Sequence, residues 1–302
     1  MNDILTLLTT AMDYDFMRRA MVTGLITAVT CGLLSCWLVL IGWSLIGDAL
    51  SHAVLPGVVL SYILGLPFAV GALVFALITV WLISLLRSKS TLLKEDAIIG
   101  TVFTPMLALG VVLISVTPSQ TDLNHILFGN LLGVTDQALI QVALLSAVTV
   151  VIAYLKRRDL TVFAFDPMHA RSVGISPQVI GALLLTLLAI TVVAALQAVG
   201  ITLVVSMLII PGVSARLFTS WIWHMLWISP LIAMAATVLG VFVSYALDTS
   251  TSGTIVLAQA LFFALAYCFA PQGLIARYRR RRGHTRPNGT DDPGERRTEP
   301  AP

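Results

Sequence analysis

The 302-residue sequence contains few charged residues. Asp, Glu, Lys and Arg together make up 11% of the chain, against about 25% in a typical soluble domain. Apolar residues make up 58%, and the mean hydropathy is +0.94. This composition excludes an ordinary soluble enzyme, and because the chain is so apolar it also excludes an intrinsically disordered protein.

Cysteine is equally scarce. The three cysteines, Cys31, Cys36 and Cys268, lie within apolar runs, and their spacing matches no zinc-binding pattern. They are too few for the disulfide framework of a small secreted domain. We assign them no function, since a buried cysteine usually behaves as a small apolar residue.

Several enzymatic motifs are missing from the sequence. It has no Gly-x-x-x-x-Gly-Lys-[Ser/Thr] phosphate-binding loop, so we do not expect the chain to hydrolyse ATP by itself. It has no His-Glu-x-x-His motif, and no second membrane aspartate accompanies Asp48 as a catalytic pair would require. These absences argue against an intramembrane hydrolase. Energy for any transport would come from a partner or an ion gradient.

Long apolar runs are abundant. A helix that crosses a bilayer needs about 20 mostly apolar residues, and the runs here are continuously apolar, unlike the alternating strands of a membrane barrel. They occupy residues 20–42, 48–65, 68–86, 97–117, 137–155, 178–197, 198–215, 222–246 and 253–272. We expect an all-α polytopic transmembrane bundle of eight or nine helices, depending on whether 48–65 and 178–215 count as full spans.

The positive charge of the chain lies at its C-terminal end. Residues 277–302 hold eight arginines and four acidic residues, whereas the rest of the chain has ten basic and eleven acidic residues. The tail is also rich in proline, glycine and threonine, a composition typical of disorder. We therefore divide the chain into a transmembrane domain, 1–276, and a basic, disordered cytoplasmic tail, 277–302.

The basic loops predict the orientation of the helices, because short loops rich in Lys and Arg stay in the cytoplasm. One topology with 118–136 and 247–252 outside places all of the following inside: Arg87 to Lys89, Lys156 to Arg158, Arg171, Arg216 and Arg277 to Arg282. Arg18 and Arg19 would also prefer the cytoplasm. That preference conflicts with nine helices and favours eight.

Asp48 is the one charged residue between Arg19 and Arg87, and His52 follows it four positions later. Side chains four residues apart share a face of a helix. A charge at the bilayer centre costs about 2.5–3.5 kcal/mol even on insertion scales, so we expect this one to serve a function. A carboxylate and an imidazole together suit manganese, iron or zinc. The alternatives are an Asp–His hydrogen bond between helices, a helix N-cap and a proton relay.

Two Pro-Gly pairs interrupt apolar runs, Pro56-Gly57 one turn after His52 and Pro211-Gly212 in the second half of the chain. Membrane helices tolerate such breaks where the backbone lines a cavity or meets a neighbouring helix. We therefore predict two broken helices that line a permeation path. This pattern favours a transporter.

The same residues carry a resemblance to a known family. The segment from Leu45 to Gly57 closely resembles the signature of the membrane permease subunits of bacterial ABC importers for zinc, manganese and iron. Further segments are similar to the family in the same order, especially to its manganese and chelated-iron branch: 122–133, 166–174, 198–212 and 252–256. The resemblance runs from about residue 15 to 275.

This resemblance implies a helical permease of the bacterial inner membrane with several partners. They are an ATPase subunit, a second permease copy or paralogue, and an external metal-binding protein; no nucleic acid is implied. It also implies that Asp48 and His52 line the path and contact a transported Mn, Fe or Zn ion, with no permanently bound cofactor. Asp122 and His125 would lie in the outward loop, near the binding protein.

The loop 156–177 is the expected contact with the ATPase. Asp166 before Pro167 predicts the start of a short helix, and Gly174 predicts its end. From the residues alone an ordinary solvated loop is favoured, whereas the resemblance implies an ATPase-coupling segment. The residues expected at the contact are Phe165, Asp166, Pro167, Ala170 and Gly174.

The predicted function is the permease subunit of an ATP-binding-cassette importer that moves a divalent metal by alternating access. The alternative is a proton-coupled secondary metal transporter, which would use Asp48 and His52 as a proton relay and would need no ATPase. Carboxylate and imidazole accept manganese, iron and zinc alike, so the residues do not select one metal.

Overall fold

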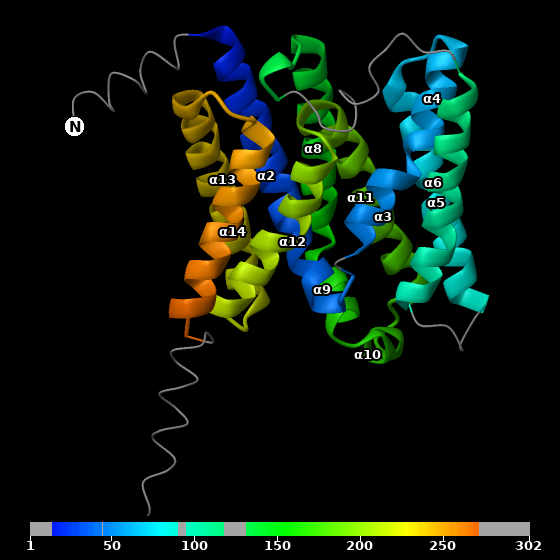
Figure 1. Cartoon of the computed structure of the whole chain (residues 1–302). Coiled ribbons are helices and arrows are strands. Elements are labelled where there is room, and N and C mark those ends of the chain that lie inside the picture. The colour runs from blue at the N-terminus through cyan, green and yellow to red at the C-terminus, as the bar shows by residue number, and fades with distance from the viewer. Residues whose placement is uncertain (1–13, 44, 90–94, 118–130, 272–302) are drawn as a thin grey trace, which may run out of the picture.

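The computed structural model describes residues 14–43, 45–89, 95–117 and 131–271, and this part of the chain is a helical bundle without strands (Figure 1). Its helices are α2 (Asp15–Ile41), α3 (Ile46–Ala53), α4 (Leu55–Leu64), α5 (Phe68–Lys89), α6 (Glu95–Val116), the 3-10 turn η1 (Leu131–Gly133), α8 (Asp136–Leu155), α9 (Arg157–Phe165), α10 (Pro167–Ser172), α11 (Pro177–Val199), α12 (Ile201–Phe218), α13 (Ile222–Leu247) and α14 (Thr251–Phe269). The predicted fold class is confirmed.

The described ranges contain nine segments that are long and apolar enough to cross a membrane. Helices α3 and α4 together make one of them, Ile46–Leu64. The run 178–215 makes two, because Gly200 separates α11 from α12 with a φ of +82° that favours glycine. The two runs whose number of spans the sequence leaves undecided, 48–65 and 178–215, therefore both count as full spans. The preference for eight helices is wrong.

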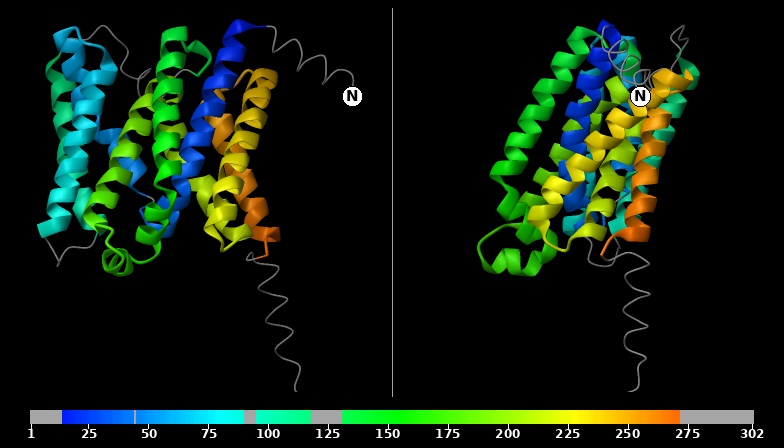
Figure 2. Two further views of the ribbon diagram at one scale, coloured as in Figure 1. Left: turned by 180° about the vertical axis from the view of Figure 1, so that it is seen from behind. Right: turned by 90° about the vertical axis from the view of Figure 1, so that its left-hand side faces the viewer.

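The nine spans place the two ends of the described chain at opposite ends of the bundle. Helix α2 begins at one end, whereas α9, α10 and the last turn of α14 lie at the other, which we call the α10 end (Figures 1 and 2). Arg87 and Lys89 are in the last turn of α5, and Arg216 is in the last turn of α12. These turns also lie at the α10 end (Figure 1), as the basic loops predict.

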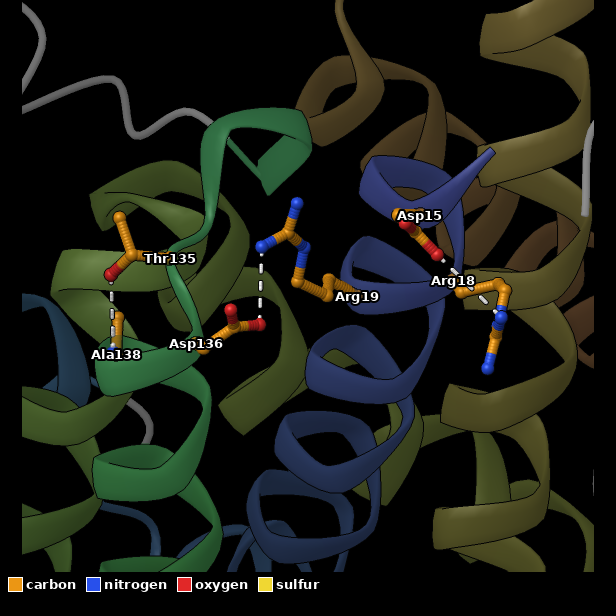
Figure 3. Close-up of polar contacts among 6 residues, drawn as sticks. All are labelled: Asp15, Arg18, Arg19, Thr135, Asp136 and Ala138. Carbon is orange, nitrogen blue, oxygen red and sulfur yellow. Dashed lines mark hydrogen bonds and ion pairs between the residues drawn. The ribbon is translucent and has the colours of Figure 1, made fainter. Parts of the chain in front are cut away.

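Arg18 and Arg19 therefore lie at the end opposite the other basic segments. Two features make this possible. The bias of Lys and Arg over all the loops sets the orientation, and that bias favours the α10 end. The two arginines also have acidic partners: Arg19 Nη1 lies 3.1 Å from Asp136 Oδ1 of α8, and Arg18 Nη1 lies 3.6 Å from Asp15 Oδ1 (Figure 3).

Helix α2 forms the centre of the bundle. It packs against α8, α12 and α13, and Leu34, Trp37 and Leu38 in its second half are completely buried. Helices α4, α5 and α6 form a neighbouring group that joins the rest through α11 and α3 (Figure 1). The short helix α3 therefore lies where the two parts of the bundle meet, in contact with α5, α6, α11 and α12.

Candidate functional site

Asp48 and His52 lie on the eight-residue helix α3, in its first and last turns. His52 Nε2 is 3.5 Å from Asp48 Oδ1, so the two side chains converge on one face as their spacing predicts. This separation is longer than the usual 2.7–3.2 Å of a hydrogen bond. The pair is therefore not locked by a tight internal hydrogen bond, and its oxygen and nitrogen lone pairs remain able to bind a ligand.

Among the described residues, the polar contact of Asp48 and of His52 is the one that they make with each other. The N-cap of α3 is Leu45, and no side chain caps this helix end, so the capping alternative for Asp48 is wrong. The side chains of Asp48 and His52 are 44% and 32% exposed. The His52 ring lies beside Phe103 of α6, with 6.5 Å between the ring centroids. The pair is thus open on one side and faces an aromatic ring on another.

Asp48 and His52 supply only two metal-binding side chains. Within the described ranges, no group of three or more His, Cys, Asp and Glu residues could hold a metal ion. A divalent transition metal in a protein usually has four or more ligands. The arrangement can therefore contact an ion, but a complete coordination sphere requires groups from outside this pair.

The first predicted helix break is confirmed. Helix α3 ends at Ala53, and α4 begins at Leu55 with Pro56 in its first turn. Gly57 packs directly on α5, where a Cβ atom would overlap with the carbonyl oxygen of Gly71, and the reverse also holds. The Gly71 N–H donates to Ser61 Oγ at 3.0 Å. Pro56 and Gly57 are both buried. The close contact of α4 with α5 therefore fixes the position of α3, which precedes the break. That Pro56 and Gly57 line an ion path stays a prediction.

The second predicted break is wrong, because α12 runs without interruption through Pro211 and Gly212. Ser35 of α2 supports the backbone at this point. The Gly212 N–H donates to Ser35 Oγ at 3.0 Å, and the Ser35 hydroxyl lies 3.4 Å from the Ile209 carbonyl oxygen. Neighbouring helices and hydroxyl side chains satisfy the backbone groups that a proline frees in a membrane helix. Gly212 also lets α12 approach the Ser35 backbone closely.

The segment expected to contact an ATPase forms two short helices, α9 and α10, at the α10 end (Figure 1). Asp166 Oδ1 accepts from the backbone N–H groups of Met168 at 2.8 Å and His169 at 3.0 Å, so Asp166 caps α10 as its place before Pro167 predicts. After α10, Gly174 adopts a φ of +83°, which turns the chain toward α11.

The exposed part of this segment is partly apolar. Phe165 and Met168 are exposed, and Asp166, Pro167 and Gly174 are exposed beside them, whereas Ala170 is completely buried. These two apolar side chains are therefore available for contact with a partner protein. Ala170 therefore supports the fold of α10 in the isolated chain, while the other four predicted residues lie on its surface.

A cluster that the sequence did not reveal joins this segment to the α3 region. Trp43, which precedes α3, packs edge-on against Phe163 of α9 with 6.1 Å between centroids. The Arg87 guanidinium of α5 lies over both rings, 4.6 Å from Trp43 and 5.7 Å from Phe163. Both aromatic side chains are almost fully buried. We call Trp43, Arg87 and Phe163 the coupling cluster. From the sequence alone, Arg87 indicates only on which side of the membrane its loop lies.

Two sequence predictions lie outside the described residues. Asp122 and His125 belong to 118–130, and the boundary between the transmembrane domain and the basic tail belongs to 272–302. The described site therefore consists of the Asp48–His52 pair, the α3–α4 break, the α9–α10 surface and the coupling cluster.

Comparison with known proteins places this arrangement in a family. The ABC 3 transport family matches residues 13–270, which is most of the chain and includes every part of the described site. This chain belongs to the ABC 3 transport family. The match confirms the resemblance that the Leu45–Gly57 segment and the other ordered segments indicate.

Relatives of known name match over nearly their whole length. A manganese transport system membrane protein of Synechocystis is 46% identical, with 93% of this chain and 91% of the relative covered. A chelated iron transport system membrane protein of Yersinia pestis is 43% identical, with 89% and 90% covered. The solved structure described as PsaBC from Streptococcus pneumoniae in complex with Fab has a TM-score of 0.81 and 36% identity, and covers 92% of this chain and 99% of that chain.

These matches settle the general class of the protein. The chain is a multi-pass membrane protein and a permease of an ABC transport system. The described fold contains a polar pair within an apolar span and two short helices at the α10 end of the bundle.

Proposed function

We propose that this permease imports a divalent metal ion, manganese or iron ahead of zinc, and that Asp48 and His52 contact the ion during its passage. The observation that carries the proposal is the half-exposed carboxylate–imidazole pair on α3, with its atoms 3.5 Å apart. Relatives named for manganese and for chelated iron transport support the choice of cargo. Metal enters as substrate, and we propose no permanently bound cofactor.

A second permease copy or paralogue would complete the site. Asp48 and His52 supply two ligands, and a partly exposed charge facing lipid is costly in a membrane span. A second copy facing the pair across a twofold axis would cover both side chains and bring a second pair of ligands to the same ion. Homo-oligomers commonly have this symmetry, and it would place the ion path between the two permeases.

Energy would come from a separate ATPase subunit bound at α9 and α10. The exposed Phe165 and Met168 provide an apolar contact there, and the capped helix α10 is a defined surface. Movement of α9 would act on Trp43 through Phe163, and Trp43 lies five residues before Asp48. ATP-driven closure of the partners would thus alternate the access of the Asp48–His52 pair, and an external binding protein would deliver the ion at the opposite end of the bundle.

The substitution Asp48→Asn tests the site. It removes the negative charge and keeps the shape of the side chain, so we expect metal uptake to be lost while the complex still assembles in the membrane. Uptake of radioactive manganese by cells or proteoliposomes that contain the whole transporter measures the effect. Asp15→Asn is the matched control, because Asp15 is an exposed acidic residue far along the chain from α3. Wild-type uptake by the Asp48 variant would exclude the site.

The energy source is tested separately. Uptake by an ABC importer stops when the ATPase subunit is removed and continues when a protonophore collapses the proton gradient. A proton-coupled secondary transporter that uses Asp48 and His52 as a relay gives the reverse result. Both measurements use the same cells and the same metal, so they distinguish the two mechanisms directly.

A further inference from the structure

An apolar groove of about 430 Å³ lies on the outside of the bundle, between α8 and α13. Both helices pack on α2, which forms the floor of the groove with Val29 and Leu33. Figure 2 (left) shows α8, α2 and α13 from this side. None of the residues that line the groove belongs to α3, α4 or α6, so the groove is separate from the Asp48–His52 pair.

One charged residue, Arg157, lines this otherwise apolar groove. Its guanidinium carbon lies 3.9 Å from the centroid of the Tyr154 ring and 5.5 Å from that of the Trp223 ring. Its Nε atom is buried and has no hydrogen-bond partner among the described residues. A buried donor without an acceptor is costly. The guanidinium thus lies over two aromatic rings and has a donor that an anionic ligand could satisfy.

The residues at one end of the groove are typical of a membrane interface. Arg157 is the first residue of α9, so it marks the α10 end. Tyr154, Trp223 and Trp227 around it are exposed, and Trp and Tyr rings concentrate where hydrocarbon meets the headgroups. Leu231, two turns into α13, is also exposed and continues the groove into the apolar part of the bundle. The groove therefore has a basic, aromatic mouth and an apolar interior.

The charge beside the mouth favours an anionic occupant. Arg157 lies between Lys156 and Arg158, and of these three basic residues only Lys156 has an acidic partner in the described structure, Asp159 at 3.1 Å. Basic pockets between membrane helices on the cytoplasmic side bind the headgroups of anionic lipids. A free phosphate would use the basic mouth but not the apolar interior, whereas a lipid would use both.

We propose that this groove binds one anionic phospholipid of the cytoplasmic leaflet. An acyl chain lies between α8 and α13 over Leu33 of α2, and the phosphate accepts hydrogen bonds from the Arg157 guanidinium. The lipid fills the gap that α8 and α13 leave on α2 and holds the first turn of α9 at the membrane surface. The site is independent of the proposed cargo, because it shares no residue with the Asp48–His52 pair.

The substitution Arg157→Gln tests the headgroup contact. The full-length chain is purified in detergent, delipidated and titrated with phosphatidylglycerol or phosphatidylcholine, and native mass spectrometry measures the bound lipid. We expect the wild type to bind one phosphatidylglycerol in preference to phosphatidylcholine. Arg157→Gln lowers the phosphatidylglycerol affinity roughly fivefold to tenfold, since one Lys or Arg near a membrane surface contributes an effect of that order. It lowers the phosphatidylcholine affinity less, because the choline cation already offsets the charge of that phosphate.

Arg158→Gln is the matched control. It removes the same charge from the next position, and Arg158 is exposed and does not line the groove. We expect its phosphatidylglycerol affinity to equal that of the wild type. Equal losses in the two variants would mean that only the general surface charge attracts lipid, and equal wild-type binding of the two lipids would mean that no headgroup is recognised. Either result overturns the proposal.

A second variant, Leu231→Trp, tests the acyl-chain contact by filling the groove at an exposed position. It lowers the binding of both lipids and leaves the helical circular dichroism of the protein unchanged. Glycerol phosphate that competed as strongly as phosphatidylglycerol would reduce the site to an anion site without an acyl chain. Cross-linking of Trp227→Cys between two copies of the chain would show a protein partner in the groove. Both outcomes contradict the lipid assignment.

Discussion

Arg19 of α2 donates a hydrogen bond to Asp136 of α8 at 3.1 Å, although the two residues are 117 positions apart in the sequence (Figure 3). Asp136 is the first residue of α8, directly after the N-cap Thr135, whose side chain accepts from the Ala138 N–H. The contact joins the outer ends of two packed helices. It gives a partner to an arginine that lies at the end of the bundle opposite the other basic segments.

We expect this contact to contribute little to stability. Asp136 is largely exposed, and ion pairs of exposed residues contribute about 0.2–1 kcal/mol. In a double-mutant cycle of Arg19→Gln and Asp136→Asn, thermal unfolding of the purified protein in detergent measures the coupling energy. A value within that range is the expected result. Asp15→Asn serves as a control, because it removes a neighbouring carboxylate that pairs with Arg18 instead.

A coupling energy of several kcal/mol would contradict this expectation. It would mean that the Arg19–Asp136 contact is needed to hold the first turns of α2 and α8 together. The packing of apolar residues between the two helices would then not be sufficient to do so. The same cycle repeated at high salt separates the two cases, because an exposed ion pair weakens as salt screens the charges.

Features that depend on residues close in the sequence could be predicted. The convergence of Asp48 and His52 follows from their spacing on a helix, and the capping of α10 follows from Asp166 before Pro167. The apolar runs predict the membrane spans, because the bilayer requires about 20 apolar residues in each. Each of these signals depends only on residues that are close together in the sequence.

Features that depend on a distant partner could not be predicted. Pro211 indicates a break, but α12 is continuous, and Ser35, 177 residues from Gly212, accepts the hydrogen bond of the Gly212 N–H there. Arg19 indicates a cytoplasmic position, but Asp136 provides a partner at the other end. Trp43, Phe163 and Arg87 come from three segments, and no sequence pattern shows that they meet. Tertiary contacts decide these cases.

The close contact of α4 and α5 predicts that Gly71→Ala is strongly destabilising. The new Cβ atom would overlap with the Gly57 carbonyl oxygen and with Ser61 Oγ. Overpacking in a core usually costs about 1–3 kcal/mol, and here one obstacle is backbone that cannot rotate away. We expect the upper end of that range or more, measured as a lower thermal midpoint, with loss of transport because α4 no longer positions α3.

Gly100→Ala in α6 is the control for this substitution. Within the described part of the chain, no atom outside its own helix turn lies within 4 Å of the added Cβ atom, and alanine stabilises a helix interior by roughly 0.5–1 kcal/mol relative to glycine. We expect an unchanged or slightly higher thermal midpoint. Equal destabilisation by the two substitutions would show that the loss comes from glycine replacement in general, and the α4–α5 contact would not explain it.

The coupling cluster predicts a variant that separates ATP hydrolysis from transport. Arg87 lies over the rings of Trp43 and Phe163, and it therefore links α5, the start of α3 and α9. Cation–π contacts contribute about 0.5–2 kcal/mol each, so Arg87→Gln loosens the cluster without removing its apolar packing. We expect the ATPase subunit to bind and hydrolyse ATP as before, while metal uptake per ATP falls severalfold because α9 no longer moves α3.

Lys89→Gln is the matched control for Arg87→Gln. Lys89 lies in the same last turn of α5 and is exposed, so its loss removes an equal charge at the same end of the bundle. Uptake and ATP hydrolysis are measured together in proteoliposomes that contain the permease and its ATPase. A parallel fall of both activities in the Arg87 variant would indicate a defect of assembly, and an equal fall of uptake in the Lys89 variant would indicate a general charge effect. Only a lower ratio of uptake to hydrolysis, confined to Arg87→Gln, identifies the cluster as the connection between the ATPase surface and the Asp48–His52 pair.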